Sequence, residues 1–116
     1  MARLSAIEFA RSLQNICNQS EIVTTYDVNI LDDTVVKVRV ALIYAAFVDV
    51  FYNANTGSCS YALIEEDARI FGVDNAFIGW HIHPFDDPTQ HVASSEISFA
   101  KFLSMIGEHF SQRGGK

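Results

Sequence analysis

The stretch Thr34-Val35-Val36-Lys37-Val38-Arg39-Val40-Ala41-Leu42-Ile43-Tyr44 decides the fold of this chain. Apolar and cationic side chains alternate along it: Val36, Val38, Val40 and Leu42 face one way, and Lys37 and Arg39 the other. A period of two with one apolar face is typical of a strand that covers a core on one side only. Such strands belong to antiparallel sheets, so the stretch predicts one.

Further strands are expected on both sides of this stretch. Residues rich in β-branched and aromatic side chains alternate with turn residues. The expected strands are Glu21–Leu31, Thr34–Tyr44, Phe47–Asn53, Ser60–Glu65, Ala68–Val73 and Phe77–His83, and the turns include Asp32-Asp33, Asn53–Gly57, Glu66-Asp67 and Asp74-Asn75. Because the turns are short, consecutive strands must run in opposite directions, which predicts an antiparallel meander.

Two helices are expected at the ends of the chain. Ser5-Ala6-Ile7-Glu8 has the capping-box pattern, so a helix should run from about Ala6 to Asn18. Ser94 or Ser95 should cap a final helix, and residues 111–116 should form a polar tail. The apolar stripe of this final helix is Phe99, Phe102, Leu103, Ile106 and Phe110. We therefore expect one α+β domain over 1–116: a meander sheet of five or six strands, with both helices packed on one face.

Strand alternation sorts the side chains between the two faces of this sheet. The helix-covered face should hold Val36, Val38, Val40, Val48, Val50, Trp80 and Ile82. The opposite face should hold Lys37, Arg39, Asp49, Tyr61, Arg69, His81 and His83, with Phe47 and Phe51 between them. Its cations could contact phosphates, and Tyr61, Phe47 and Phe51 could stack on bases. It could equally be a solvated face, with Asp49 pairing a cation, or meet a partner protein or a second copy.

Composition restricts the class of protein. The chain has 116 residues, 49% of them hydrophobic, which suits one folded domain with a real core. The net charge of −6 gives no overall field that attracts nucleic acid. Cys17 and Cys59 lack metal-motif spacing and no secretory signal is evident, so we expect a cytoplasmic protein. No apolar run reaches the roughly 20 residues of a membrane span.

Three of the four histidines lie between His81 and His91, around the stretch Gly79-Trp80-His81-Ile82-His83-Pro84-Phe85. In a strand, His81 and His83 would project from the same outward face, and His91 would follow on a loop. Three imidazoles placed in this way could hold a divalent metal or form a catalytic patch. They could instead anchor a loop through hydrogen bonds to Asp74, Asp86 and Asp87.

The second half of the chain, roughly Phe47 to Phe110, resembles the TumE-type toxins of toxin–antitoxin pairs. The similar features are an aromatic-rich hairpin, Asp74-Asn75, the His-x-His-Pro segment and a closing helix. The resemblance implies a toxin that acts on RNA and is neutralised by an antitoxin protein. His81, His83 and His91 would then act as general acid and base, with Arg39 or Lys37 stabilising phosphate charge. Lys37, Asp74, Asn75, Tyr61 and Arg69 are the candidate binding residues.

The stretch Gly79–Pro84 is also similar to the zinc motif of the JAMM metallopeptidases. That motif continues with a serine and an aspartate, where this chain has His91 and Ser94, and here the His-x-His lies one residue nearer to Trp80. The similarity implies a metal-dependent hydrolase with a carboxylate base such as Glu65 or Glu66.

Three functional classes therefore stay open from the sequence. The first is a toxin that uses its histidines without a metal. The second is a metal-dependent hydrolase with His81, His83 and His91 as ligands. The third is a non-catalytic binding or assembly protein, including a homo-oligomer, in which the histidines only hold a loop.

Overall fold

A computed structural model describes residues 3–76 and 79–114 of the chain. Its elements, in chain order, are α1 (Ala6–Gln19), β1 (Val23–Leu31), β2 (Val35–Leu42), β3 (Phe47–Asn53), β4 (Cys59–Glu65), β5 (Ala68–Asp74), β6 (His81–His83), β7 (Val92–Ala93) and α2 (Phe99–Gly114). The seven strands form one sheet in the order β1 to β7, each antiparallel to the next. The α+β meander with a helix at each end is confirmed. The strand beyond the expected five or six is β7, whose two residues are too few to show alternation.

The alternation of β2 sets the two faces of the sheet. Val36, Val38 and Val40 pair with Tyr52, Val50 and Val48 of β3, and all six side chains are buried. The two intervening cations of β2 are exposed on the other face. There Arg39 donates two hydrogen bonds to the carboxylate of Asp49, at 3.0 and 3.2 Å, so the expected cross-strand pair forms.

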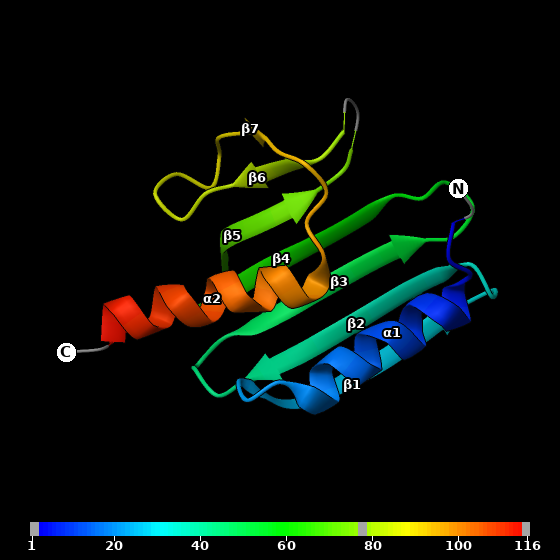
Figure 1. The fold of residues 1–116 in the computed structure, drawn as a ribbon, viewed down its shortest axis with the longest axis horizontal. Helices are drawn as coiled ribbons and strands as arrows, with labels where there is room; N and C mark the ends of the chain where they lie inside the picture. Colours follow the sequence, from blue (N-terminus) through cyan, green and yellow to red (C-terminus); the bar gives the residue numbers. More distant parts are fainter. Residues whose placement is uncertain (1–2, 77–78, 115–116) are drawn as a thin grey trace.

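Both helices cover the same face of the sheet (Figure 1). The capping box of α1 forms as expected: the Glu8 amide donates to Ser5 Oγ, and the Ser5 amide donates to Glu8 Oε1. The Phe9 ring of α1 stacks on Tyr52 of β3, with ring centroids 4.2 Å apart. Phe102 of α2 is fully buried against β4 and β5. Within residues 3–76 and 79–114, neither helix has the length and apolarity needed to cross a membrane.

The final helix begins later and ends later than the sequence predicts. The Lys101 amide donates to Ser98 Oγ, so Ser98 caps α2, and the expected cap at Ser94 or Ser95 is wrong. The Ser94 hydroxyl instead donates to the Ser95 carbonyl. Residues 111–114 are helical rather than a tail, because Arg113 reaches back to the Glu65 carboxylate with two hydrogen bonds of 3.0 and 2.7 Å. Residues 115–116 lie outside the described part.

Tyr61 lies on the opposite face from the one predicted. It pairs with Val50 and Val73, is buried, and packs against Phe99 and Phe102. The sequence of β4 alternates Cys59, Tyr61 and Leu63 with smaller side chains, and the helix-covered face takes the larger set. Tyr61 is therefore a core residue and not part of an open binding surface.

The last predicted strand, Phe77–His83, is shorter than expected. Only His81–His83 form β6, because Gly79 has a φ of +119° and Trp80 lies outside the ladder. Residues 77–78 fall outside the described part of the chain. Trp80 and Ile82 are half-buried and pack against the core, as the strand pattern predicted.

Replacing Phe102 with alanine tests the packing of α2. The fully buried ring contacts Tyr61 and Phe71, so Phe102→Ala should destabilise the fold by about 3–5 kcal/mol in urea unfolding. Ser104→Ala, at an exposed position of the same helix, should change the free energy of unfolding by less than about 0.5 kcal/mol. Equal stabilities of the two variants would contradict the placement of α2.

The Glu65–Arg113 pair predicts a pH-dependent contribution to stability. The hydrogen bonds from Arg113 lower the pKa of Glu65 and outweigh the opposing effect of burial. A carboxyl with a lowered folded-state pKa stabilises the fold above its ordinary pKa, and this contribution is lost as the pH falls through the lowered value. Glu65→Gln should therefore be less stable than the wild type at neutral pH, by up to about 1 kcal/mol, and the two should converge as the pH falls below the lowered pKa of Glu65. A difference that stays constant with pH would argue against the pair.

Candidate functional site

The histidines meet where β5, β6 and the segment before β7 lie side by side. His81 pairs with Asp74 across the β5–β6 ladder, and His83 pairs with Gly72. Ile82, between them, pairs with Val73 on the helix-covered side. His81 and His83 therefore project together from the face without helices, as strand alternation predicted.

The three imidazoles form a compact cluster. The ring centroids of His91 lie 4.9 Å from His81 and 4.5 Å from His83, and those of His81 and His83 lie 5.1 Å apart. One nitrogen of each ring lies within 4.8 Å of the other two. Ligand nitrogens 2.0–2.1 Å from a tetrahedral zinc would be about 3.4 Å apart, so a movement of about 1 Å would close the set. His91 is exposed on a loop and can make that movement.

Asp74 faces two of these rings. Its Oδ1 lies 3.0 Å from His81 Nε2, and its Oδ2 lies 2.9 Å from His83 Nε2. Burial raises the pKa of the Asp74 carboxyl, but the hydrogen bonds from His83 and the Ala76 amide, with the nearby histidine charges, outweigh it and lower the pKa overall. Asp74 is thus an anion held between two imidazoles.

The other nitrogens of the same two rings face backbone carbonyls. His81 Nδ1 lies 3.1 Å from the Gly79 carbonyl, and His83 Nδ1 lies 3.0 Å from the Gln90 carbonyl. Carbonyl oxygens accept only, so each Nδ1 must carry a proton. When both nitrogens of a ring are protonated, its Nε2 donates to an Asp74 oxygen; when the ring is neutral, its Nε2 holds a lone pair that faces the same oxygen. A cation bound between them would satisfy every one of these atoms, and metal-ligating histidines ordinarily donate the second ring N–H in this way.

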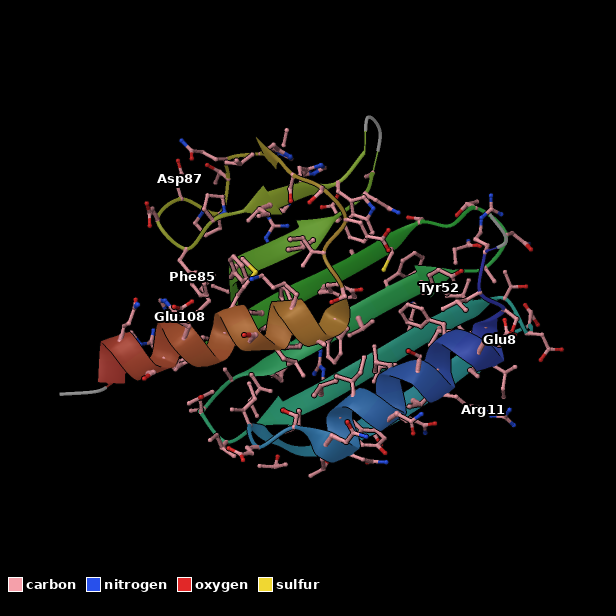
Figure 2. All side chains as sticks on the ribbon, viewed as in Figure 1. Glu8, Arg11, Tyr52, Phe85, Asp87 and Glu108 are labelled. Atoms are coloured by element: carbon pink, nitrogen blue, oxygen red, sulfur yellow. The ribbon has the colours of Figure 1, made fainter. Side chains whose placement is uncertain are left out.

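The histidine side chains are less accessible than their outward direction suggests. His81 is 8% exposed and His83 only 3%, whereas His91 is exposed. The physical reason is that the segment between β6 and β7 folds back over the sheet. Figure 2 shows Phe85 at the start of this segment reaching toward α2, where its ring stacks on His109 and on Phe71, and Asp87 further out on the loop.

Arg69 holds the same segment from β5. Its Nη2 donates to the Pro88 carbonyl at 3.0 Å. The Arg69 stem crosses Gly72: a Cβ on Gly72 would lie 3.3 Å from Arg69 Cδ, 3.3 Å from the Tyr61 carbonyl oxygen and 3.6 Å from His83 Cδ2. A glycine at this position therefore lets an arginine lie beside the buried histidine.

The remaining candidates from the sequence lie elsewhere. Lys37 and Arg39 are on β2, four strands from β6, and the Arg39 guanidinium is already paired with Asp49. Asn75 is structural: its Oδ1 accepts from the Cys59 amide and its Nδ2 donates to the Gly57 carbonyl. Of the expected loop anchors, Asp74 contacts the histidines, whereas Asp87 bonds to Thr89. Glu65, one of the two glutamates proposed as a base, pairs with Arg113, and the carboxylate that lies beside the rings is Asp74.

The sequence does not indicate the Gly79 and Gln90 carbonyls as part of the site. Backbone groups carry no residue-type signal, and the Gln90 carbonyl reaches His83 only because the loop folds back. Gly72 and Gly79, two glycines flanking the Asp74 turn, are the one local hint that the backbone bends closely here.

Comparison with protein-family models, with curated proteins and with solved structures finds no match to this chain. The interpretation of the cluster rests on its own geometry.

Removing the most buried histidine should destabilise the fold. His83→Ala would leave Asp74 without one donor and the Gln90 carbonyl without its partner, which should cost about 1–3 kcal/mol in urea unfolding of chelator-treated protein. Lys37→Ala, exposed on the same face, should stay within about 0.5 kcal/mol of the wild type. A His83→Ala variant as stable as the lysine control would show that these buried hydrogen bonds contribute nothing.

Proposed function

We propose that this protein is a metal-dependent hydrolase whose divalent ion is bound by His81, His83 and His91 together with Asp74. The observation that carries the proposal is the orientation of the two buried imidazoles. Their Nδ1 atoms are held by backbone carbonyls, and their Nε2 atoms converge on one carboxylate. A cluster that only anchored a loop would not need three rings to bring their nitrogens together.

The donor set favours a borderline transition metal. Three imidazole nitrogens and one carboxylate oxygen suit Zn²⁺, Fe²⁺, Co²⁺ or Ni²⁺ better than Ca²⁺ or Mg²⁺, which take oxygen ligands. Cys17 and Cys59 are buried away from the cluster and burial raises the pKa of each thiol to about 11, so neither offers a thiolate.

Two further features of the site support hydrolysis. A bound divalent ion acts as a Lewis acid and lowers the pKa of a water molecule. His91 marks the side of the cluster that solvent reaches, so a substrate would approach there. Arg69, whose stem approaches Gly72 on the same side as His83, donates to the neutral Pro88 carbonyl and, within the described residues, pairs with no carboxylate, which leaves its charge available to an anionic group of a substrate.

The resemblance to TumE-type toxins supplies the cellular setting of this proposal. In that setting the chain is a cytoplasmic toxin that hydrolyses RNA and is neutralised by an antitoxin protein. The cation beside the cluster supports a phosphodiester substrate over an uncharged one. A metal-independent version with the histidines as general acid and base is the competing mechanism, because it uses the same side chains.

Metal content tests the proposal directly. Wild-type protein should bind close to one Zn²⁺ or Co²⁺ ion per chain, and Co²⁺ should give a visible spectrum with nitrogen ligation. His91→Ala should lose metal affinity by more than the roughly 10–100-fold that follows loss of an outer-shell partner. Because His91 is exposed, the same variant should unfold within about 0.5 kcal/mol of the wild type in chelator. Gln90→Ala, the matched neighbour, should keep the metal.

Activity provides the second readout. Expression of the wild-type chain should slow growth, His91→Ala should relieve this, and RNA hydrolysis in vitro should stop with chelator and return with Zn²⁺ or Co²⁺. Hydrolysis that continues in chelator would overturn the metal mechanism and support the metal-independent one. Wild-type protein that takes up none of these ions would reject the metal site itself.

A further inference from the structure

The face of the sheet without helices is open over β1 to β4. Both helices lie on the other side (Figure 1), and the segment between β6 and β7 covers only the end of the sheet near β5 and β6. A groove of about 440 Å³ lies on this open face. Its polar, charged and aromatic lining residues are Asp27, Asn29, Lys37, Arg39, Asp49, Phe51 and Ser60.

One row of cross-strand partners connects residues that line the groove with the histidine cluster. Asn29, Lys37, Phe51, Ser60, Asp74 and His81 are successive partners across β1 to β6. All of them therefore project from the same face. From Lys37 to His81 the row crosses four strand spacings of about 4.8 Å, or roughly 19 Å. One line of side chains thus joins the groove to the candidate metal ligands.

The charges of this face differ from those of the whole chain. The chain carries a net charge of −6. This face also carries the carboxylates of Asp27, across from Arg39, and of Asp74. In the described residues, Lys37 and Arg69 have no carboxylate within ion-pair distance, whereas Arg39 and Asp49 pair with each other. The unpaired cations lie at the start of the row and beside the cluster at its end. Two unpaired cations at separate points of one sheet face suit a chain of anions more than a single one.

Phe51 adds a stacking surface between these cations. Phe51 is the β3 partner of Lys37 in this row. Its side chain is half-buried and lies on the face that neither α1 nor α2 covers. An aromatic ring beside a cation on an open sheet is the arrangement by which single strands are held, because an unpaired base stacks on the ring while the cation meets the phosphate. Ser60 and Asn29, which flank the pair, offer hydrogen-bonding groups to a ribose hydroxyl.

We infer that the row from Asn29 to His81 is a binding track for single-stranded RNA, which leads the strand into the metal centre. The inference rests on the proposed function, because it takes the histidine cluster at the end of the row to be the catalytic metal centre. It adds the substrate class, single-stranded rather than duplex RNA, and the residues that hold the strand away from the reacting bond. From Asn29 to His81 the track crosses five strand spacings, or roughly 24 Å, which suits a few nucleotides and is close to the smallest sites of about four nucleotides in known single-strand binders.

Binding of a labelled, unstructured oligouridylate in chelator, followed by fluorescence anisotropy, tests the track without cleavage. Phe51→Ala should weaken binding roughly five- to hundredfold, the range for loss of one base-stacking ring. Lys37→Gln should reduce the slope of log affinity against log salt by about 0.7. Lys101→Gln, the same charge change at an exposed site on α2, should bind as the wild type does. The same sequence as a duplex should bind more weakly, because paired bases cannot stack on Phe51.

Each contrary outcome has a definite meaning. Unchanged affinity in both Phe51→Ala and Lys37→Gln would overturn the track, and equal binding of the matching DNA would overturn its assignment to RNA. Because binding is measured in chelator, it is independent of the metal. RNA binding that needs Phe51 and Lys37 in a protein that takes up no metal would support the track and reject the proposed centre; a metal-binding protein that holds no RNA would do the reverse.

Discussion

The burial of one face of β2 and β3 is the constraint on which the rest of the structure depends. Three valines of β2 and their partners on β3 place a continuous apolar surface on one side of the sheet. That surface must be covered, and in the part of the chain that the structure describes the apolar stripes available for this are those of α1 and α2. Both helices therefore pack on the same side, and no helix is left for the other. The polar face of this sheet is open as a direct consequence of the valine alternation.

Two polar side chains on the open face, those of His81 and His83, are nevertheless buried and need cover from another segment. His81 and His83 lie near the edge of the sheet, where two short strands give little cover. The chain solves this by folding residues 84–91 back, with Phe85 inserted against Phe71 and His109 at one end and the Gln90 carbonyl bonded to His83 at the other. Arg69 ties the middle at Pro88. The same loop brings His91 to the cluster. The course of residues 84–91 therefore both shields His81 and His83 from solvent and places His91 beside them.

The sequence predicts what depends on periodicity and fails where single contacts decide. The two-residue alternation along strands predicts the meander and the common direction of His81 and His83. The capping box of α1 follows from a motif of four residues. The sequence predicts the wrong face for Tyr61 because a phenol suits either face of a sheet, and the neighbouring Cys59 and Leu63 fix its direction. Ser98 could not be told from Ser94 or Ser95 as a cap, since each precedes the apolar stripe. The burial of the histidines depends on the course of a loop, and loops have no period.

Asp74 connects these levels of organisation. It ends β5, it pairs with His81 in the ladder, and its two carboxylate oxygens divide between His81 and His83. If a cation occupies this position, its ligands come from β5, from β6 and from the loop before β7. Metal binding would then stabilise the contacts among these three segments, which lie near the edge of the sheet. The protein without metal would then be less ordered at this edge than the protein with it, while the valine core and both helices would be unaffected. Site assembly and core folding are thus separable in this chain, because the two are built on opposite faces of the same strands.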